Sequence, residues 1–553
     1  MNHPQRKSAA TRDNMSGDSP WSPLRKAIFR SIWIALIVSN IGTWMQSVGT
    51  SWLMTSLTPS PLLVALMQTA ILLPVFLFGL PAGALADIVD RRKLLLITET
   101  WLLLIAFVLG ILTFAEHINA WALLALTFLM GLGSALDAPL WQAIVPDLVE
   151  RQDLPAAVAL NATGFNVARA IGPALGGLVI ATMGPAAVFF LNAVSFLWVL
   201  VAIYRWRRTI IPSNTPPEDI LGAIVAGMRY VRHAPALQAV LVRIGVFTIG
   251  ASALWALLPA VARYELNLGA AGYGILLGSF GFGAVSSALI QHRLRALLSV
   301  DRLTAAAAVV FAGATLALAY IRFVPLLVIC LMMGGMAWLA TSSSLTTAAT
   351  TVAPAWVRAR ALGLYLLVFA GAMSIGSFAW GALAENFGNG FALTVAALFL
   401  VVGLVATRYW SLKAIQHLDL SPSMHWPEPQ VAITPAPEDG PVMVTVEYRV
   451  SPEQADKFIH AMEEMRRFRY REGAIRWDFF RDLADPDRYL EIILAPSWAE
   501  HMRQHARVTV MDQEIEAHAF SFVQPGVNPT AAHLIAIHPD DRQIPTVPYT
   551  QLT

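Results

Sequence analysis

The sequence predicts an all-α membrane protein with twelve transmembrane helices in two six-helix repeats, followed by a small cytoplasmic α+β domain. Three observations support this fold class. Charged residues are scarce until about residue 437 and frequent after it, twelve apolar segments are long enough to cross a bilayer, and glycines recur at a fixed offset. A single soluble globular fold is therefore excluded.

The two parts of the chain differ in composition. Of the 553 residues, 56% are apolar and 13% are charged, against about 25% charged in an ordinary soluble domain. Residues 438–553 carry 31 charged side chains and residues 1–437 only 43. The net charge of +2 combines a basic first part with an acidic second part, and no nucleic-acid partner is expected. The single cysteine, Cys330, excludes an intrachain disulfide.

Each transmembrane helix needs about 20 mainly apolar residues. We expect the first such segment to be a retained helix rather than a cleaved signal peptide. The predicted spans are 31–54, 62–84, 94–115, 120–141, 157–182, 186–204, 238–262, 271–290, 303–321, 324–348, 360–384 and 389–409. Connections on one side carry 22 Lys and Arg residues, and those on the other carry only Arg263 and Arg322. This asymmetry predicts a multi-pass inner-membrane protein with both termini in the cytoplasm.

Glycines of the fifth and eleventh spans recur at an offset of 204 residues. The matching positions are Gly172 and Gly376, Gly177 and Gly381, Gly184 and Gly388, and, in the second and eighth spans, Gly79 and Gly283. Two six-helix halves repeated in the same sense resemble the major facilitator family, whose substrate site lies near mid-membrane between the halves. The resemblance implies that fold and a transport function.

The remaining chain divides into linkers and tails. The prolines of the second linker predict an extended spacer, so we expect the C-terminal part to be a separate body. Apolar residues recurring from Ile220 to Val231 predict a helix on the membrane surface. The predicted organisation is a tail over 1–25, a bundle over 26–205, a linker with this helix over 206–237, a bundle over 238–410, a proline-rich linker over 411–441, an α+β domain over 442–525 and a tail over 526–553.

Residues 83–93 read GALADIVDRRK. This segment resembles the first cytoplasmic loop of major facilitator transporters, with matches at Gly83, Asp87, Arg91 and Arg92 and departures at Ile88 and Asp90. The resemblance implies a gating role, in which the Asp87 carboxylate makes charge-assisted hydrogen bonds in one conformation and loses them in the other. The alternative is that the basic residues only fix the topology of the loop.

The fifth span has one polar face, formed by Asn161, Asn166 and Arg169. An ionised group in mid-span costs at least about 2.5–3.5 kcal/mol, so Arg169 should face a water-filled cavity or an anionic partner. Asp137 is a candidate partner, although it lies closer to the membrane edge. The alternative for Arg169 is a structural pair or hydrogen bonds to backbone carbonyls.

Small residues of the fifth span are typical of close helix packing. Gly172, Pro173, Gly176 and Gly177 resemble the pattern of drug and proton antiporters, with Ala168 in place of a glycine. This likeness favours export. Many proton-coupled members carry an arginine at the position of Thr127, so proton coupling of this protein is implied only by the resemblance to the family. In this family, further cavity positions correspond to Asn40, Gln46, Gln68, Trp255 and Tyr365, although each alone is also typical of packing.

The C-terminal part predicts a βαββαβ order, which fits a ferredoxin-like domain. We expect strands at 442–450, 474–482, 488–495 and 518–524, with helices after Pro452 and over 497–516. Residues 471–482 and 497–506 resemble the small dimeric monooxygenases of antibiotic biosynthesis. With the twelve helices, the chain resembles a subgroup of major facilitator exporters that includes the enterobactin exporter.

The monooxygenase resemblance would make Trp477, His501 and His505 the catalytic candidates. The two histidines lie four residues apart on one helical face, a spacing that also suits a metal, but a third ligand is missing. We expect binding or dimerisation rather than catalysis, and no metal or cofactor.

The leading hypothesis is a secondary active transporter, not an enzyme, that exports a small amphipathic siderophore, drug or metabolite by alternating access. Protons are the expected coupling ion, and the lipid bilayer and the small-molecule substrate are the expected partners. Two alternatives are a membrane-anchored enzyme or sensor acting through the C-terminal domain, and an importer of the same fold. Because the sequence contains no Walker phosphate loop, an ATP-driven pump is disfavoured.

Overall fold

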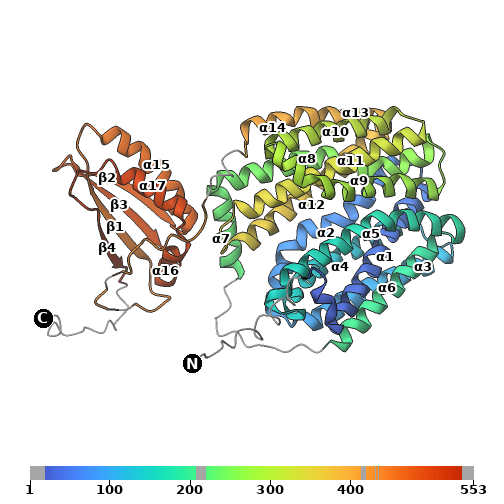
Figure 1. Ribbon diagram of the computed structural model, residues 1–553, viewed down its shortest axis with the longest axis horizontal. Helices are drawn as coiled ribbons and strands as arrows, with labels where there is room; N and C mark the ends of the chain where they lie inside the picture. Colours follow the sequence, from blue (N-terminus) through green and yellow to red (C-terminus); the bar gives the residue numbers. More distant parts are fainter. Residues whose placement is uncertain (1–18, 207–219, 413–418, 430, 434, 538–553) are drawn as a thin grey trace, which may run out of the picture. The chain divides into compact units, whose positions relative to one another are not determined.

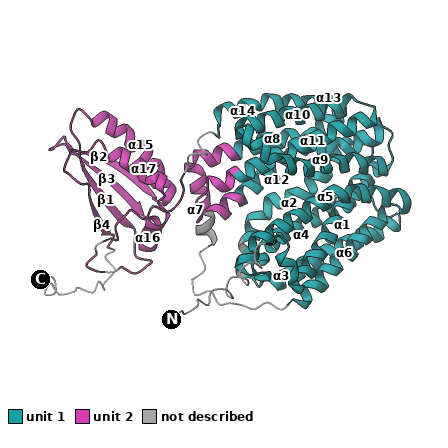
Figure 2. Ribbon diagram, in the orientation of Figure 1, with its two compact units in different colours: residues 1–216, 241–347, 363–413 teal, residues 217–240, 348–362, 414–553 magenta. Residues whose placement is uncertain are grey.

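The computed structural model describes residues 19–206, 220–412, 419–429, 431–433 and 435–537. It divides into two compact units, which Figure 2 shows in different colours. The first unit comprises Met1–Pro216, Leu241–Thr347 and Gly363–Lys413. The second comprises Pro217–Val240, Ala348–Leu362 and Ala414–Thr553.

Twelve helices of the described chain are long and apolar enough to span a membrane, which confirms the predicted number. The first half contains α1 (Ala27–Leu57), α2 (Pro61–Ile88), α3 (Arg91–Phe114), α4 (Ala120–Leu148), α5 (Leu154–Met183) and α6 (Pro185–Arg205) (Figure 1). The second half contains α8 (Pro235–Ala260), α9 (Ala270–Leu297), α10 (Val300–Tyr320), α11 (Val324–Thr351) and α12 (Arg358–Phe387). The last span is divided into α13 (Asn389–Val402) and α14 (Leu404–Tyr409).

Side chains at the N-termini of several helices satisfy backbone groups that lack a partner within the helix. Ser60 accepts a hydrogen bond from the Leu63 N–H of α2 at 3.2 Å. Asn119 accepts one from the Ala122 N–H of α4 at 2.9 Å. Asp90, a departure from the family's loop pattern, caps α3 by accepting from the N–H groups of Arg92 and Lys93. The helix boundaries are therefore encoded locally.

The glycine repeat corresponds to equivalent helix contacts in the two halves. Gly184 and Gly388 precede α6 and α13 with φ of +81° and +86°, which a residue with a side chain adopts only under strain. A Cβ on Gly172 would meet Trp44 of α1, and one on Gly376 would meet Ile249 of α8. The repeat therefore marks joints and crossings that the two halves share.

The second unit contains a four-stranded antiparallel sheet in the order β2-β3-β1-β4 (Figure 1). Its strands are β1 (Val442–Arg449), β2 (Arg476–Arg481), β3 (Arg488–Ala495) and β4 (Thr530–Ile535), and its helices are α15 (Ala455–Glu472), α16 (Trp498–Arg507) and α17 (Val510–Phe520). Every second residue of β1 is buried, as the alternation in the sequence predicts. These inward side chains pack on α15 through Phe458, Met462 and Met465.

Two predictions for this domain are wrong. Residues 497–516 form two helices, because Thr509 starts α17 with a reciprocal capping box to Asp512. α17 then continues to Phe520, so the strand predicted at 518–524 is absent there. The fourth strand is β4, within the stretch that the sequence analysis assigned to a tail, and it pairs with β1 from Val442↔Ile535 to Glu447↔Thr530.

The predicted spacer over 411–441 is not extended where the structure describes it beyond residue 418. Ser423 N donates to Val508 O at 3.0 Å, and Trp426 Nε1 donates to Glu516 at 2.9 Å. Near the other end of the segment, Pro437 O accepts from Ala499 N at 2.9 Å. Backbone groups and buried aromatic contacts thus hold this segment on the domain despite its prolines.

The predicted linker helix is α7 (Ile220–His233). It belongs to the second unit, so the C-terminal body includes more than the residues after 438. Arg229 forms an ion pair with Glu500 at 3.3 Å, and the His233 ring stacks on Tyr470 at 5.3 Å between centroids. Polar contacts therefore attach the described part of α7 to the domain, while its location on a membrane surface stays a prediction.

Candidate functional site

Arg169 lies half-way along α5 among three tryptophan rings. Its guanidinium carbon is 5.8 Å from the Trp44 ring, 5.5 Å from Trp255 and 6.0 Å from Trp338. Trp44 belongs to α1 in the first half, whereas Trp255 of α8 and Trp338 of α11 belong to the second. We call Arg169 with these three rings the arginine cage. The cage therefore joins the two halves.

No ion pair to Arg169 is found among the described residues. Its Nε atom is buried and has no hydrogen-bond partner there. Three cation–π contacts stabilise the guanidinium by about 0.5–2 kcal/mol each. They offset the cost of placing an ionised group in a membrane helix but leave the hydrogen-bond donors unused. Such a site can accept an anionic group.

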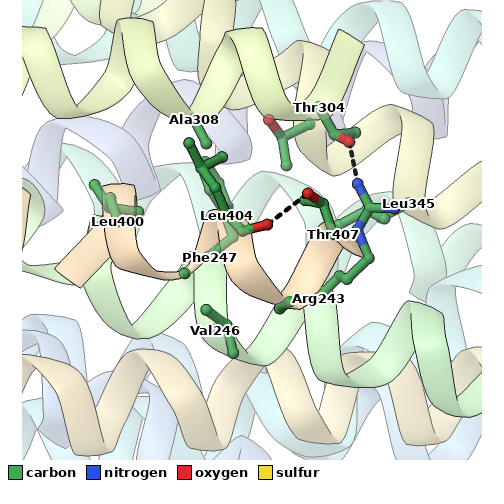
Figure 3. A pocket seen from close by; sticks show the side chains of 12 residues that line it. Arg243, Val246, Phe247, Thr304, Ala308, Leu345, Leu400, Leu404 and Thr407 are labelled. Carbon is green, nitrogen blue, oxygen red and sulfur yellow. Dashed lines mark hydrogen bonds between the residues drawn. The ribbon is translucent and has the colours of Figure 1, made fainter. Parts of the chain in front are cut away.

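Arg243, a second arginine inside a predicted span, differs from Arg169 because its guanidinium is paired. It lies in α8 and is 4% exposed. Its guanidinium forms an ion pair with Asp301 of α10. It also donates a hydrogen bond to Thr304 of the same helix (Figure 3). The adjoining pocket has a volume of only about 30 Å³, close to the share of one water molecule in liquid water. Arg243 therefore makes a structural contact between α8 and α10, whereas the Arg169 Nε has no hydrogen-bond partner among the described residues.

Aromatic side chains extend from the cage into the second half. Trp255 contacts Phe280 of α9 edge to face at 4.9 Å and Trp338 at 5.6 Å, and Trp338 also contacts Phe369 of α12 at 5.9 Å. Aromatic pairs in such geometries favour flat, apolar partners. The cage thus combines one cation with an aromatic surface.

The other predicted cavity residues are distributed more widely. Asn40, Gln68, Asn161 and Asn166 are half-buried, and Asn166 donates to Ala162 O within its own helix at 2.9 Å. Gln46 is instead 3% exposed and accepts a hydrogen bond from Asn192 of α6 at 2.6 Å, and Tyr365 donates to Ser342 O of α11 at 3.3 Å. Gln46 and Tyr365 are therefore engaged in helix packing.

Asp137, considered as a partner of Arg169, contacts α3 instead. Its carboxylate accepts a hydrogen bond from Thr98 at 3.1 Å and interacts electrostatically with Glu99. Glu99 is 2% exposed, accepts from Trp141 Nε1 at 3.2 Å, and has its second oxygen buried without a partner among the described residues. The structure thus brings together two intramembrane carboxylates, of which the sequence analysis named only Asp137.

The predicted gating residues lie at the junction of α2 and α3. Arg91 donates to Ala143 O of α4 at 3.0 Å, and Arg92 donates to Tyr204 O of α6 at 2.6 Å. Asp87 lies in the last turn of α2, and its side chain is outside the described part of the structure. Gly83 is half-buried in the same helix. The two arginines therefore bridge the ends of neighbouring helices in this conformation.

The glycines of α5 allow the two halves to approach. A Cβ on Gly177 would lie 2.6 Å from Ala270 O and 2.9 Å from the Gly274 Cα of α9, and one on Gly176 would lie 2.8 Å from the Met45 Cα of α1. In the second half, a Cβ on Gly381 would lie 2.5 Å from the Ala65 Cβ of α2. Small residues thus permit backbone contact between α5 and α9. Pro173 is buried in α5 between these crossings.

We expect Gly177→Ala to separate α5 from α9, because its methyl group would meet backbone atoms that cannot move aside. Overpacking costs about 1–3 kcal/mol, so the equilibrium should shift about 5- to 150-fold away from this conformation. Spin labels on cysteines introduced at Thr182 and Asn267, in a Cys330→Ser background, would report a longer distance. Gly79→Ala is the control, since no atom lies within 4 Å of its added Cβ. Equal distances in both variants would contradict the assignment.

The structure separates the catalytic candidates of the C-terminal domain. Trp477 lies in β2 at one edge of the sheet, and its Nε1 donates to Glu491 at 2.8 Å. His501 and His505 lie on α16 next to His533 of β4, the opposite edge strand. The described contacts therefore bring His501 and His505 together but not Trp477, and an oxygenase pocket stays a prediction. The resemblance of the domain to small monooxygenases stays a prediction.

Twelve spanning helices in two six-helix halves define the architecture of a membrane transporter. Residues 18–541 match the family described as "Transmembrane secretion effector", and the chain belongs to this family of major facilitator transporters. It is therefore a multi-pass membrane protein.

Relatives of known name include two siderophore transporters. The chain is 27% identical over 403 residues to the enterobactin exporter EntS of Escherichia coli, covering 69% of this chain and 92% of that protein. It is 29% identical over 177 residues to the staphyloferrin A transporter of Staphylococcus aureus, covering 32% of this chain but only 45% of that protein. A bacterial homologue of the iron transporter ferroportin has a similar fold, with a TM-score of 0.56 at 17% identity, covering 70% of this chain and 98% of that structure.

Proposed function

We propose that the protein exports a small amphipathic anion, of the siderophore class, by alternating access. The single observation that carries this proposal is the unpaired Arg169 guanidinium among three tryptophan rings from both halves. A carboxylate or catecholate oxygen would occupy the free donors, and a flat apolar body would contact the rings. The names of the two siderophore-transporting relatives support the same substrate class.

A proton gradient would drive this export through Glu99 and Asp137. Two neighbouring carboxylates in a membrane helix pair cannot both be ionised cheaply, so one of them holds a proton. The buried, unpartnered oxygen of Glu99 is the position where a proton would be carried. Loss and gain of this proton would change the contact between α3 and α4 and so bias the conformational equilibrium.

We propose that the protein lies in the inner membrane with both chain ends in the cytoplasm. On this orientation, several contacts between the halves lie at the periplasmic ends. Ser60 donates to Glu385 of α12 at 2.7 Å, and Tyr264 donates to Thr58 O at 2.8 Å. These contacts would close the periplasmic side in the described conformation.

The C-terminal domain is proposed to be ferredoxin-like. The strand order β2-β3-β1-β4 and the antiparallel pairing of every neighbour support this assignment. We assign it a binding or dimerisation role. An exporter lacking residues 438–553 should keep partial transport, whereas a membrane-anchored enzyme or sensor would lose all activity.

The decisive experiment uses sealed proteoliposomes with a pyranine pH indicator inside. Enterobactin, staphyloferrin A and an uncharged control solute are supplied in turn, with a pH gradient imposed in either direction. The proposal expects saturable flux of one anionic substrate coupled to counter-movement of protons. Flux of the uncharged solute alone, or the absence of gradient-dependent flux with every solute, would overturn the proposed function. Flux in the import direction alone would show that the protein is an importer.

Glu99→Gln is expected to uncouple transport from the pH gradient, because the amide keeps the shape of the side chain but carries no titratable proton. Gradient-driven accumulation should fall to the level of carrier-free liposomes, while substrate exchange without a gradient persists. Glu116→Gln, at an exposed residue after α3, is the matched control. Gradient-driven transport by Glu99→Gln at the wild-type rate would remove Glu99 from the coupling path.

A further inference from the structure

Three histidines that lie far apart in the sequence meet in the C-terminal domain. His501 and His505 occupy successive turns of α16, and His533 lies on β4, where it pairs with Val444 of β1. One ring nitrogen from each residue lies within 4.8 Å of the others. The ring centroids are 4.9 Å apart for His501 and His505 and 5.0 Å apart for His501 and His533.

We propose that His501, His505 and His533 bind one divalent transition-metal ion. Imidazole nitrogen is a preferred ligand of zinc, copper and nickel, and three such nitrogens with one open position form a known type of zinc site. The spacing of four residues on α16 supplies two ligands from one helical face, and β4 supplies the third. This site is independent of the transport site in the helical unit.

The state of His501 supports this assignment. The residue is 3% exposed, and its Nε2 atom is buried with no hydrogen-bond partner among the described residues. Its Nδ1 lies 3.4 Å from Gln504 Oε1, which can only accept, so Nδ1 carries the proton and Nε2 has a free lone pair. An unmet buried acceptor costs about 1–3 kcal/mol, whereas a metal ion would use it. Gln504 would hold the ring in the ligating tautomer.

Aromatic rings pack directly against two of the proposed ligands. Trp498 contacts His501 at 5.5 Å between centroids, and Trp426 contacts His505 at 5.1 Å.

The geometry requires only a small adjustment. Zinc–nitrogen bonds of about 2.0–2.1 Å in a tetrahedron place the ligand nitrogens about 3.3 Å apart. The present separations of up to 4.8 Å therefore close by at most ~1.5 Å. His505 and His533 are half-buried, so rotation of their side chains can supply this movement without a change in the backbone.

The test uses the full-length protein in detergent after treatment with a chelator. Zn²⁺ is titrated in competition with a chromophoric chelator, and Co²⁺ is titrated with absorption spectroscopy to report tetrahedral coordination. We expect one Zn²⁺ per chain and intense Co²⁺ bands. Loss of an outer-shell partner already weakens metal binding about 10- to 100-fold, so loss of a ligand in His533→Ala should weaken it by at least ~100-fold.

His505→Gln is the second variant, because it keeps the bulk of a half-buried side chain. His460→Ala is the matched control, since this histidine is exposed on α15 of the same domain. Hydrogen exchange of β1 checks that each variant is folded. Wild-type protein without stoichiometric Zn²⁺, or wild-type affinity in either folded ligand variant, would overturn the proposal. Stoichiometric Zn²⁺ binding by a wild-type protein that shows no gradient-dependent flux of any solute would instead overturn the proposed function and leave the metal site standing.

Discussion

Arg169→Ala is expected to weaken substrate binding strongly while leaving the protein folded in the membrane. The guanidinium has no counter-charge among the described residues, so its removal strands no carboxylate. The loss of a hydrogen-bonded charge contact of about 1.5–3 kcal/mol corresponds to a roughly 10- to 150-fold weaker affinity for an anionic substrate. Substrate-induced quenching of the tryptophan fluorescence of the cage would measure this change.

Two further arginine variants separate binding from stability. Arg169→Lys keeps the charge but loses the planar stacking on the rings, so an intermediate affinity is expected. Arg243→Ala leaves Asp301 in the bundle without its ion pair, and its yield of folded protein should fall. Substrate affinity of Arg169→Ala equal to that of the wild type would remove the cage from the transport path.

The elements that depend on local composition could be predicted from the sequence. Twelve spans follow from runs of apolar residues, and the alternation from Val442 onward marks β1. The glycine repeat also located equivalent joints, because Gly184 and Gly388 both need a positive φ. These features depend on neighbours within a few residues or on a fixed offset, so a single sequence contains the information.

The sites depend on contacts that no local pattern records. In the sequence, nothing distinguishes Trp44 and Trp338 from other tryptophans of apolar spans. Only the packing of the two halves places their rings next to Arg169. Glu99 could have been found from its sequence, because an acid in a predicted span is costly and needs a function. His533 could not, since the strand that carries it lies beyond the last predicted element and reaches α16 only by pairing with β1.

The C-terminal domain has a buried ionic network centred on Arg469 of α15. Arg469 Nε lies 2.9 Å from Glu491 of β3, and its Nη1 lies 2.8 Å from Glu516 of α17. Tyr448 donates to Glu491 at 2.6 Å, and Trp477 donates to it at 2.8 Å. Burial alone would lower the pKa of Arg469, but the two carboxylates outweigh it and raise the pKa. One side chain therefore neutralises acids from a strand and a helix.

Arg469→Met should unfold or loosen this domain, because it leaves two buried carboxylates without their cation. Breaking a buried pair costs about 3–5 kcal/mol, so amide protection in β1 and β3 should fall roughly 150- to 4,000-fold in hydrogen exchange. Arg467→Met, on the exposed side of the same helix, is the control and should change protection little. Equal protection in both variants would contradict the role of the network.

Amide protection should depend on pH in opposite ways in the wild type and in Arg469→Met. In the wild type, burial opposes ionisation of Glu516, but Arg469, His425 and Trp426 together hold its pKa below the ordinary 4.5. Its contribution to stability is thus present above pH 4.5 and is lost as the pH falls through the lower pKa of the folded state. Without Arg469, burial raises the pKa of Glu516, so the variant should recover more protection than the wild type between pH 7 and pH 5, where this carboxylate takes up a proton. A variant whose protection does not rise over this interval would show that its defect is not an uncompensated charge.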